Sequence, residues 1–254
     1  MAEAPFERIA HLVVVPVELN GVETRFVVDS GIGLTVVRDT VAGCVPSGES
    51  FTGKRMSGQE VTVPLGAAPS LRFAGEEHND VEVGLLDMSG FPAALAGVDG
   101  FLSLALFAET PLTVDYPRER VLAGKRAGGV RLPCRVDRDG PSVTMFLPLT
   151  LPDGRAIEVE VDMGSDALIL DERFAELGAS DVRRVEGTDE TGHRYTRLFT
   201  TLRGRVHPTA APGLGQDEPD VMFQSIIHDG LVGDAFLRRF AVTFDVADGS
   251  LALI

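Results

Sequence analysis

Short apolar or alternating runs, each closed by a turn signal, follow one another along the first half of the chain. The first two, Leu12–Leu19 and residues 24–28, flank Asn20-Gly21, a dipeptide in which both residues tolerate the positive φ angles of a tight hairpin turn. The pattern therefore predicts a β-hairpin. Further strands are predicted at residues 35–37, 60–63, 70–73, 80–86, 112–115 and 121–123, and long helical periodicity is nearly absent.

A run of small and charged residues at 124–129 interrupts this pattern, which then begins again. Apolar residues at 147–151, a Pro152-Asp153-Gly154 turn and a second run at 156–161 reproduce the opening hairpin. We interpret this as an internal duplication, with one lobe in residues 1–126 and the other in residues 127–254.

Two aligned pairs of segments support the duplication. Asp29-Ser30-Gly31 falls on Asp162-Met163-Gly164 at an offset of 133 positions. Near the end of each half, Asp99-Gly100-Phe101-Leu102 falls on Asp229-Gly230-Leu231-Val232 at an offset of 130, and this second alignment continues without a gap to the last strand of each half. The shared order of both pairs indicates two related halves.

Asp29 and Asp162 each stand at the end of an apolar strand, where a lone carboxylate is costly to desolvate unless it is hydrogen-bonded or shares a proton. The glycine two positions later lets the chain turn and brings a backbone N–H close to the carboxylate. If an approximate twofold axis relates the halves, the two turns meet there and the acids become neighbours. One acid of such a pair can act as a general base on water while the other, protonated, donates to a substrate carbonyl.

With these residues the sequence resembles the aspartic peptidases of the retropepsin and pepsin type, whose hallmark is Asp-Thr/Ser-Gly in each lobe, followed later by two apolar residues and glycine. Asp29-Ser30-Gly31 matches the first element in full, and Leu231-Val232-Gly233 matches the later one. The resemblance implies an all-β fold of two homologous retropepsin-like β-barrel lobes, related by a pseudo-twofold axis with a cleft between them.

The same resemblance implies an aspartic endopeptidase that hydrolyses peptide bonds with a water molecule activated by Asp29 and Asp162. It calls for no metal and no cofactor. Support of the two active loops is assigned, on the same ground, to Ser30, Gly31, Met163, Gly164 and Ser165.

Three features depart from the family pattern. Met163 stands where the family carries a hydroxyl residue that helps to lock the two active loops together. Ser103 replaces the glycine of the later element in lobe one, and Ile32-Gly33 follow the first triplet where small hydroxyl residues or alanine are usual. Because the dyad geometry depends on this support, two alternatives stay open. One is a non-catalytic peptide-binding or interaction protein with a degenerate fold of this kind, and the other is an unrelated all-β ligand binder whose aspartates are turn residues.

In this family a hairpin from one or both lobes closes over the substrate. The two candidates here are residues 54–63, which turn at Ser57 and Gly58, and residues 187–199, which turn at Thr191 and Gly192. Tyr195 is a flap aromatic or an ordinary strand aromatic. A flap would hold an extended peptide by strand-like main-chain hydrogen bonds.

Charge and composition exclude some classes of binding partner. The formal net charge is −15, from 38 acidic and 23 basic residues, and no basic cluster is dense enough to follow a phosphate backbone, so nucleic acid is not expected. The five histidines and two cysteines lack metal-ligand spacing, so we predict no metal site and expect the histidines at the surface or in turns.

No apolar run reaches the ~20 residues of a membrane span, and the first ten residues do not resemble a secretory signal. We therefore expect a cytoplasmic protein that binds no membrane and acts on a peptide or protein substrate. We expect a monomer, because one chain carries both halves of the site.

Overall fold

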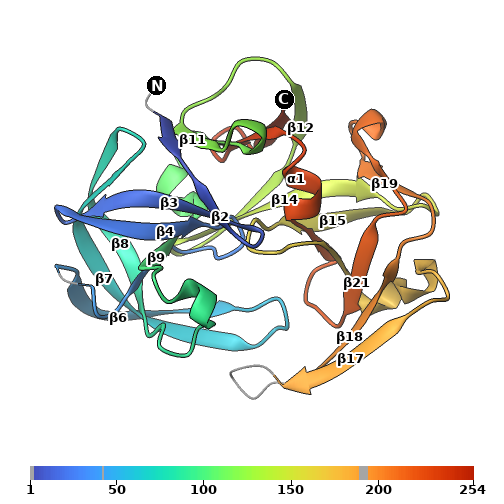
Figure 1. Ribbon diagram of the computed structural model, residues 1–254, viewed down its shortest axis with the longest axis horizontal. Helices are drawn as coiled ribbons and strands as arrows, with labels where there is room; N and C mark the ends of the chain where they lie inside the picture. The colour runs from blue at the N-terminus through green and yellow to red at the C-terminus, as the bar shows by residue number, and fades with distance from the viewer. Residues whose placement is uncertain (1–2, 42, 189–193) are drawn as a thin grey trace.

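The computed structural model describes residues 3–41, 43–188 and 194–254. Two lobes built of strands lie side by side, the first coloured blue to green and the second yellow to red, and a sheet that contains β11 and β12 lies across their top (Figure 1). The predicted all-β, two-lobed fold is confirmed. The described part of the chain contains no helix long and apolar enough to cross a membrane.

The sheet of lobe one has eight strands, and its first hairpin is the one that the Asn20-Gly21 turn predicts. Asn20 and Gly21 both have positive φ angles, 51° and 79°, as such a turn requires. In spatial order the strands are β2 (Glu7–Ile9), β3 (Leu12–Leu19), β4 (Val22–Val28), β9 (Gly100–Leu102), β5 (Val36–Arg38), β8 (Glu76–Leu86), β7 (Glu60–Phe73) and β6 (Val45–Lys54).

The sheet of lobe two has ten strands and repeats the same central order. Its main path, read in the direction that matches lobe one, is β20 (Gln216–Asp217), β19 (Arg205–Pro208), β14 (Ser142–Thr150), β15 (Ala156–Val161), β22 (Gly230–Val232), β16 (Leu168–Asp171), β21 (Asp220–Gln224), β18 (Arg194–Thr201) and β17 (Arg183–Thr188), with β13 (Arg135–Asp139) paired to β14.

The two lobes place their central strands in the same register. In lobe one, β4 runs parallel to β9 and β5 runs antiparallel to β9, and β15, β22 and β16 repeat both pairings in lobe two. The Asp29 N–H donates to the Leu102 carbonyl at 2.9 Å, and the Asp162 N–H donates to the Val232 carbonyl at 3.0 Å. Both acids therefore leave their sheets at the same point of the repeated unit.

A six-stranded sheet joins the lobes. Its order is β1 (Glu3–Pro5), β11 (Arg120–Ala123), β10 (Leu112–Asp115), β23 (Ala241–Asp245), β24 (Ser250–Leu253) and β12 (Val130–Pro133). At its centre β10 pairs antiparallel with β23, and Thr113 lies opposite Thr243, its counterpart in the repeat. Their hydroxyl oxygens are 2.7 Å apart. The pseudo-twofold axis therefore passes between these two threonines, and the division that we propose at residue 126 falls between β11 and β12.

Two strand predictions differ from the structure. The segments predicted at 60–63 and 70–73 are parts of one strand, β7, and the long strand β6 that pairs with it was not predicted. The helices are short, of three to six residues: η1 (Ala93–Leu95), η2 (Leu104–Phe107), η3 (Tyr116–Arg118), η4 (Glu172–Leu177), η5 (Pro212–Leu214) and α1 (Asp234–Leu237).

The threonine pair on the axis gives a test of the shared sheet. Both side chains are buried, and in Thr113→Val the Thr243 hydroxyl loses its partner, so we expect the free energy of unfolding to fall by about 1–3 kcal/mol. The double variant with Thr243→Val should lose less than the sum of the two single changes. Urea denaturation measures all three. The control is Thr62→Val, which removes an exposed hydrogen bond between Thr62 and Thr52. If the stability losses of Thr113→Val and Thr243→Val were strictly additive, the expectation would be contradicted.

Candidate active site

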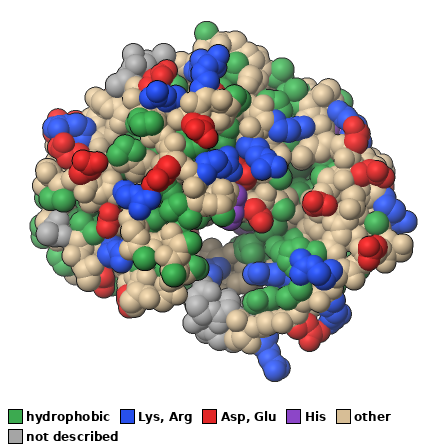
Figure 2. Space-filling model, viewed as in Figure 1, with side chains coloured by type: hydrophobic (Ala, Val, Ile, Leu, Met, Phe, Trp, Pro, Cys, Tyr) green, Lys and Arg blue, Asp and Glu red, His purple; other side chains and the backbone are tan. Residues whose placement is uncertain are grey.

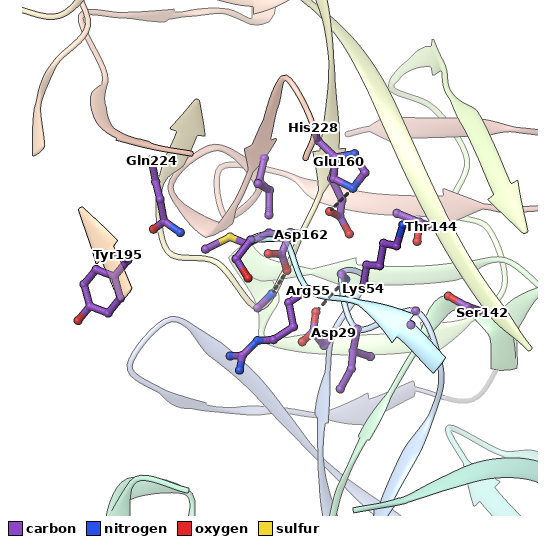
Figure 3. Close-up of a pocket in the computed structure, with 18 of the residues that line it drawn as sticks. Asp29, Lys54, Arg55, Ser142, Thr144, Glu160, Asp162, Tyr195, Gln224 and His228 are labelled. Carbon is purple, nitrogen blue, oxygen red and sulfur yellow. Dashed lines mark hydrogen bonds and ion pairs between the residues drawn. The ribbon is translucent and has the colours of Figure 1, made fainter. Parts of the chain in front are cut away.

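Asp29 and Asp162 follow β4 and β15 and lie against each other between the lobes (Figure 3). Each Oδ1 accepts the backbone N–H of the glycine two positions later, Gly31 or Gly164, at 2.8 Å. The two carboxyl groups are near enough for each to shift the pKa of the other. The repeated turn thus gives each acid a backbone donor and brings the pair into contact.

Both glycines are needed for this contact. A methyl group added at Gly164 would come within 2.6 Å of Asp29 Oδ2, and one added at Gly31 would overlap the Asp162 carboxyl. Each carboxyl group therefore packs against the bare backbone of the opposite loop, where no larger residue fits.

Burial sets the charge state of the pair. It raises the pKa of Asp29, although hydrogen bonds from backbone N–H groups and the nearby Asp162 carboxyl group act in the opposite direction. Burial raises the pKa of Asp162 well above its usual range, and the charges of Asp29 and Glu160 raise it further. The two acids titrate as one unit that retains a proton to higher pH than separate carboxyl groups do.

Ser30 links the two active loops. Its hydroxyl donates to the Val161 carbonyl at 2.6 Å and accepts the Met163 N–H at 3.0 Å. Met163 supplies no hydroxyl in return, and its side chain is buried in the main core. The link predicted at these positions is thus built from one side, by Ser30, while Met163 contributes its backbone N–H and apolar packing.

The remaining family positions are accommodated locally. The Ser165 N–H donates to the Asp162 carbonyl at 3.2 Å, and a side chain at Gly233 would overlap the Ser165 carbonyl. In lobe one, Ser103 is tolerated because Thr35 accepts its backbone N–H at 3.1 Å and lies 3.2 Å from its hydroxyl. Ser103 therefore replaces glycine without leaving a buried polar group unpaired.

A cleft of about 460 Å³ opens above the dyad. Figure 2 shows the molecule hollowed between the two lobes. The lining comes from both lobes, and it includes the dyad loops, the flap residues Lys54, Arg55, Met56 and Ser57, and the lobe-two residues Thr144, Glu160, Tyr195, Arg197, Gln224, His228 and Leu231.

Two cleft residues were missed by the sequence analysis. Glu160 is only 7% exposed, although Glu158, two positions earlier on the same strand face, is exposed. Its Oε2 lies 3.7 Å from His228 Nε2 (Figure 3). Burial and the charge of Asp29 raise the pKa of Glu160 to about 8, and burial lowers the pKa of His228.

The expectation that the histidines lie at the surface or in turns is wrong for His78 and His207, which lie half-buried in β8 and β19. His11 lies in the turn between β2 and β3 and His228 in the loop before β22, but both make contacts that the sequence does not indicate. His228 is half-buried in the cleft, with its ring centroid 4.9 Å from that of Phe146. His11 reaches the opposite lobe, where its Nε2 lies 2.9 Å from the Gly164 carbonyl oxygen. The contact of His11 comes from the packing of one lobe on the other, whereas the contacts of His228 with Phe146 and Glu160 lie within lobe two.

The β6–β7 hairpin covers the cleft, with Ser57 and Gly58 at its tip. Gly58 has a φ of 81°, and a side chain there would come within 2.9 Å of Ile227 in lobe two. The Met56 carbonyl accepts the Ile227 N–H at 2.9 Å. The Met56 side chain packs on an apolar cluster of lobe two, formed by Ile169, Met222 and Leu231. This flap is closed and anchored on the opposite lobe.

The second candidate flap is the β17–β18 hairpin. Its predicted turn residues, Thr191 and Gly192, lie outside the described residues. Tyr195 lines the cleft, its ring lies over Gly187 in the paired strand, and the Arg197 guanidinium lies 4.1 Å from the ring centroid. Arg197 also donates to Gln224 Oε1 at 2.8 Å, so Tyr195 belongs to an ordered wall of the cleft.

Across residues 3–41, 43–188 and 194–254, no group of three or more His, Cys, Asp or Glu side chains is arranged to hold a metal ion. The acids that meet at the dyad are held by backbone N–H groups and by each other. That donor set suits proton transfer between carboxyl groups and water.

The chain has a two-lobed, pepsin-like fold that carries a pair of acids between its lobes. Residues 15–103, most of lobe one, match the family model described as aspartyl protease. Among solved structures, the chain is similar to basic 7S globulin from soybean, with a TM-score of 0.58 and 9% identity, over 99% of this chain and 95% of that chain. No curated protein matches the chain.

These findings confirm the resemblance to the aspartic peptidases of the retropepsin and pepsin type. The similarity to the globulin shows the fold alone, because the identity is so low, and that neighbour is named for a globulin and not for a peptidase. Activity has to be argued from the site.

Ser30→Ala tests the one-sided link between the loops. It leaves the buried Met163 N–H without its partner, so we expect the free energy of unfolding to fall by about 1–3 kcal/mol in urea denaturation. Ser165→Ala is the control, because the Ser165 hydroxyl makes no hydrogen bond within the described residues. Equal stability losses in the two variants would show that Ser30 does not hold the loops together.

Glu160→Gln tests the burial of the third acid. The pKa of Glu160 is about 8 in the folded protein against 4.5 for the free side chain, so the folded state binds more protons between these values and stability falls as pH rises from about 4.5 to 8. Glutamine cannot ionise, so the variant should match the wild type near pH 4.5 and exceed it by roughly 3–5 kcal/mol at pH 8. Glu158→Gln, an exposed change on the same strand, should show no such pH-dependent difference in stability from the wild type. If the stability of Glu160→Gln and of the wild type changed in parallel with pH, the raised pKa of Glu160 would be contradicted.

Proposed function

We propose that this protein is an aspartic endopeptidase that hydrolyses peptide bonds with a water molecule activated by Asp29 and Asp162. The observation that carries the proposal is the contact of two buried, hydrogen-bonded carboxyl groups at the floor of a cleft between two related lobes. Such a pair holds one acid and one base side by side at the same pH.

The two acids take different roles. Burial raises the pKa of both acids, and the charges of Asp29 and Glu160 help to raise the pKa of Asp162 well above its usual range, so Asp162 is the acid that we assign the proton. Asp29 is therefore the general base and Asp162 the general acid in the first step.

The reaction follows from this assignment. Asp29 takes a proton from water as the water oxygen bonds to the scissile carbonyl carbon, and Asp162 gives its proton to the carbonyl oxygen. Asp29 then passes its proton to the amide nitrogen, the C–N bond breaks, and a hydroxyl proton of the intermediate returns to Asp162. The dyad regains its starting state, and the chain forms no covalent bond with the substrate.

The flap supplies groups for an extended peptide. The Ser57 hydroxyl is buried and lacks a hydrogen-bond partner in the described part of the chain, and it lines the cleft beside the dyad. A peptide main chain that lies between flap and dyad can satisfy it. The partner is thus a peptide or protein substrate, and one chain suffices to assemble the site.

A non-catalytic peptide-binding protein is the second candidate. The missing hydroxyl at Met163 favours it, because the loops are linked from one side only. This protein would keep the cleft and the flap while the dyad holds no productive water.

Asp29→Asn and Asp162→Asn separate the two candidates. An unstructured protein substrate, incubated between about pH 3 and 7, should be cleaved by the wild type and at least about 100-fold more slowly by either variant, because each loses one member of the acid–base pair. Because the pKa values of both acids are raised, the wild-type rate should persist toward the upper end of this range. Asp153→Asn, in an exposed turn, is the control. Peptide binding without cleavage by the wild type would support the second candidate.

A further inference from the structure

Glu160 occupies the position that Val27 occupies in lobe one. Val27 pairs with Phe101 across the parallel β4–β9 ladder, and Glu160 pairs with Leu231 in the same way across β15–β22. Val27 is fully buried in an apolar cluster, whereas its counterpart is a carboxylic acid. The fold therefore accepts an apolar residue at this point, and the acid in lobe two has to be explained by something other than the backbone.

The chain covers the two positions differently. In lobe one, residues 87–99 connect β8 to β9 and pack four side chains onto the cluster around Val27: Met88, Phe91, Leu95 and Val98. In lobe two, the corresponding connection consists of residues 225–229, and the equivalent cluster is covered by Ile226 and by Met56 of the flap. The space that lobe one fills with its own side chains is part of the open cleft in lobe two, where Glu160, His228, Leu231 and Thr144 line it.

Glu160 lacks a partner suited to a buried acid. Within the described residues its one ion-pair partner is His228, whose Nε2 lies 3.7 Å from Glu160 Oε2, and its carboxyl group makes no hydrogen bond. The cationic side chains that line the same cleft, Lys54, Arg55 and Arg197, form no ion pair with it. Buried polar groups without partners are rare in folded proteins, and such a group in a cleft is one that a ligand can satisfy.

We propose that this open part of lobe two is a subsite for a lysine or arginine side chain of the peptide, with Glu160 as the residue that determines the preference. The inference rests on the proposed peptidase function and names its substrate class. Glu160 precedes Asp162 by two positions on the same strand face and lies beside it (Figure 3), so the basic residue adjoins the scissile bond.

The surroundings suit such a side chain. Leu231 offers an apolar wall for the methylene stem, and the cationic end reaches the Glu160 carboxyl, which ionises and releases its proton to solvent. Neutral His228 can accept a further hydrogen bond from the same cation. The net charge of −15 attracts cationic peptides over a longer range.

Matched peptides test the subsite. Octapeptides of alanine and leucine would carry either lysine or norleucine, which keeps the stem without the ammonium group, at each of the four central positions. The wild type should cleave the best lysine peptide with a kcat/KM at least tenfold above that of its norleucine twin. Glu160→Gln should remove this preference, and Glu160→Val, which installs the lobe-one residue, should reverse it.

Two control variants locate the effect. Glu158→Gln removes one negative charge from the same strand outside the cleft, and Lys54→Met removes a cationic side chain that lines the cleft; both should keep the lysine preference. The proposal would be overturned if Glu160→Gln kept the wild-type ratio of kcat/KM between the lysine and norleucine peptides. It would also be overturned if Glu158→Gln lost the lysine preference as Glu160→Gln does.

Binding measurements separate this inference from the proposed function. Titration calorimetry of the same peptides at pH 7, with the Asp162→Asn variant to prevent turnover and in two buffers of different ionisation enthalpy, should show tighter binding of the lysine peptide with proton release. Both effects should vanish when Glu160→Gln is added to that variant. If the wild type cleaves nothing but this binding pattern holds, the peptidase proposal fails and the subsite stands. If peptides are cleaved with no lysine preference in cleavage or binding, the subsite fails and the peptidase stands.

Discussion

The contact between the Asp29 and Asp162 carboxyl groups is the constraint on which the rest of the structure depends. Two buried acids of the same sign cannot both ionise at close range, so the fold has to supply backbone donors and one shared proton. The Gly31 and Gly164 N–H groups meet the first need, and the raised pKa values of both acids keep a proton on the pair. The pairing of β10 with β23 fixes the axis across which the contact forms.

Duplication explains why one chain can build this contact, and the differences between its halves explain how the site becomes directional. If the two halves were identical, Asp29 and Asp162 would have identical environments. Ser30 links the loops from lobe one alone, Glu160 raises the pKa of Asp162 from lobe two alone, and the anchored flap belongs to lobe one. Each departure from symmetry makes the environment of one acid differ from that of the other.

The parts of the fold that sequence reasoning could predict are those with a local cause. The Asn20-Gly21 hairpin follows from turn chemistry, and the repeat follows from the order of its segments. Strand β6 could not be predicted because almost all of it is exposed and its side chains do not alternate between core and solvent. Strand β7 was divided because Pro64 and Gly66 are usual breakers, yet long pairing with β6 and β8 carries the strand through both.

The residues of the candidate site likewise fall into those that the local sequence could predict and those that it could not. Asp29 and Asp162 could be found because glycine follows each at a repeated spacing, and spacing is a property of the sequence. Glu160 and His228 could not, because the surface that covers them belongs to the packing of flap, lobe and loop. An acid in an alternating strand carries the same local pattern whether it faces solvent or a cleft between lobes.

The comparison of Glu160 with Val27 shows how one duplicated position can serve stability in one half and recognition in the other. Valine adds to a closed apolar cluster, whereas the acid at the same backbone position is costly to bury and lowers stability near neutral pH. Residues that break a local rule in this way are expected at functional sites, where the rest of the structure compensates for them. The short β21–β22 connection follows the same logic, because a longer one would fill the space that the acid faces.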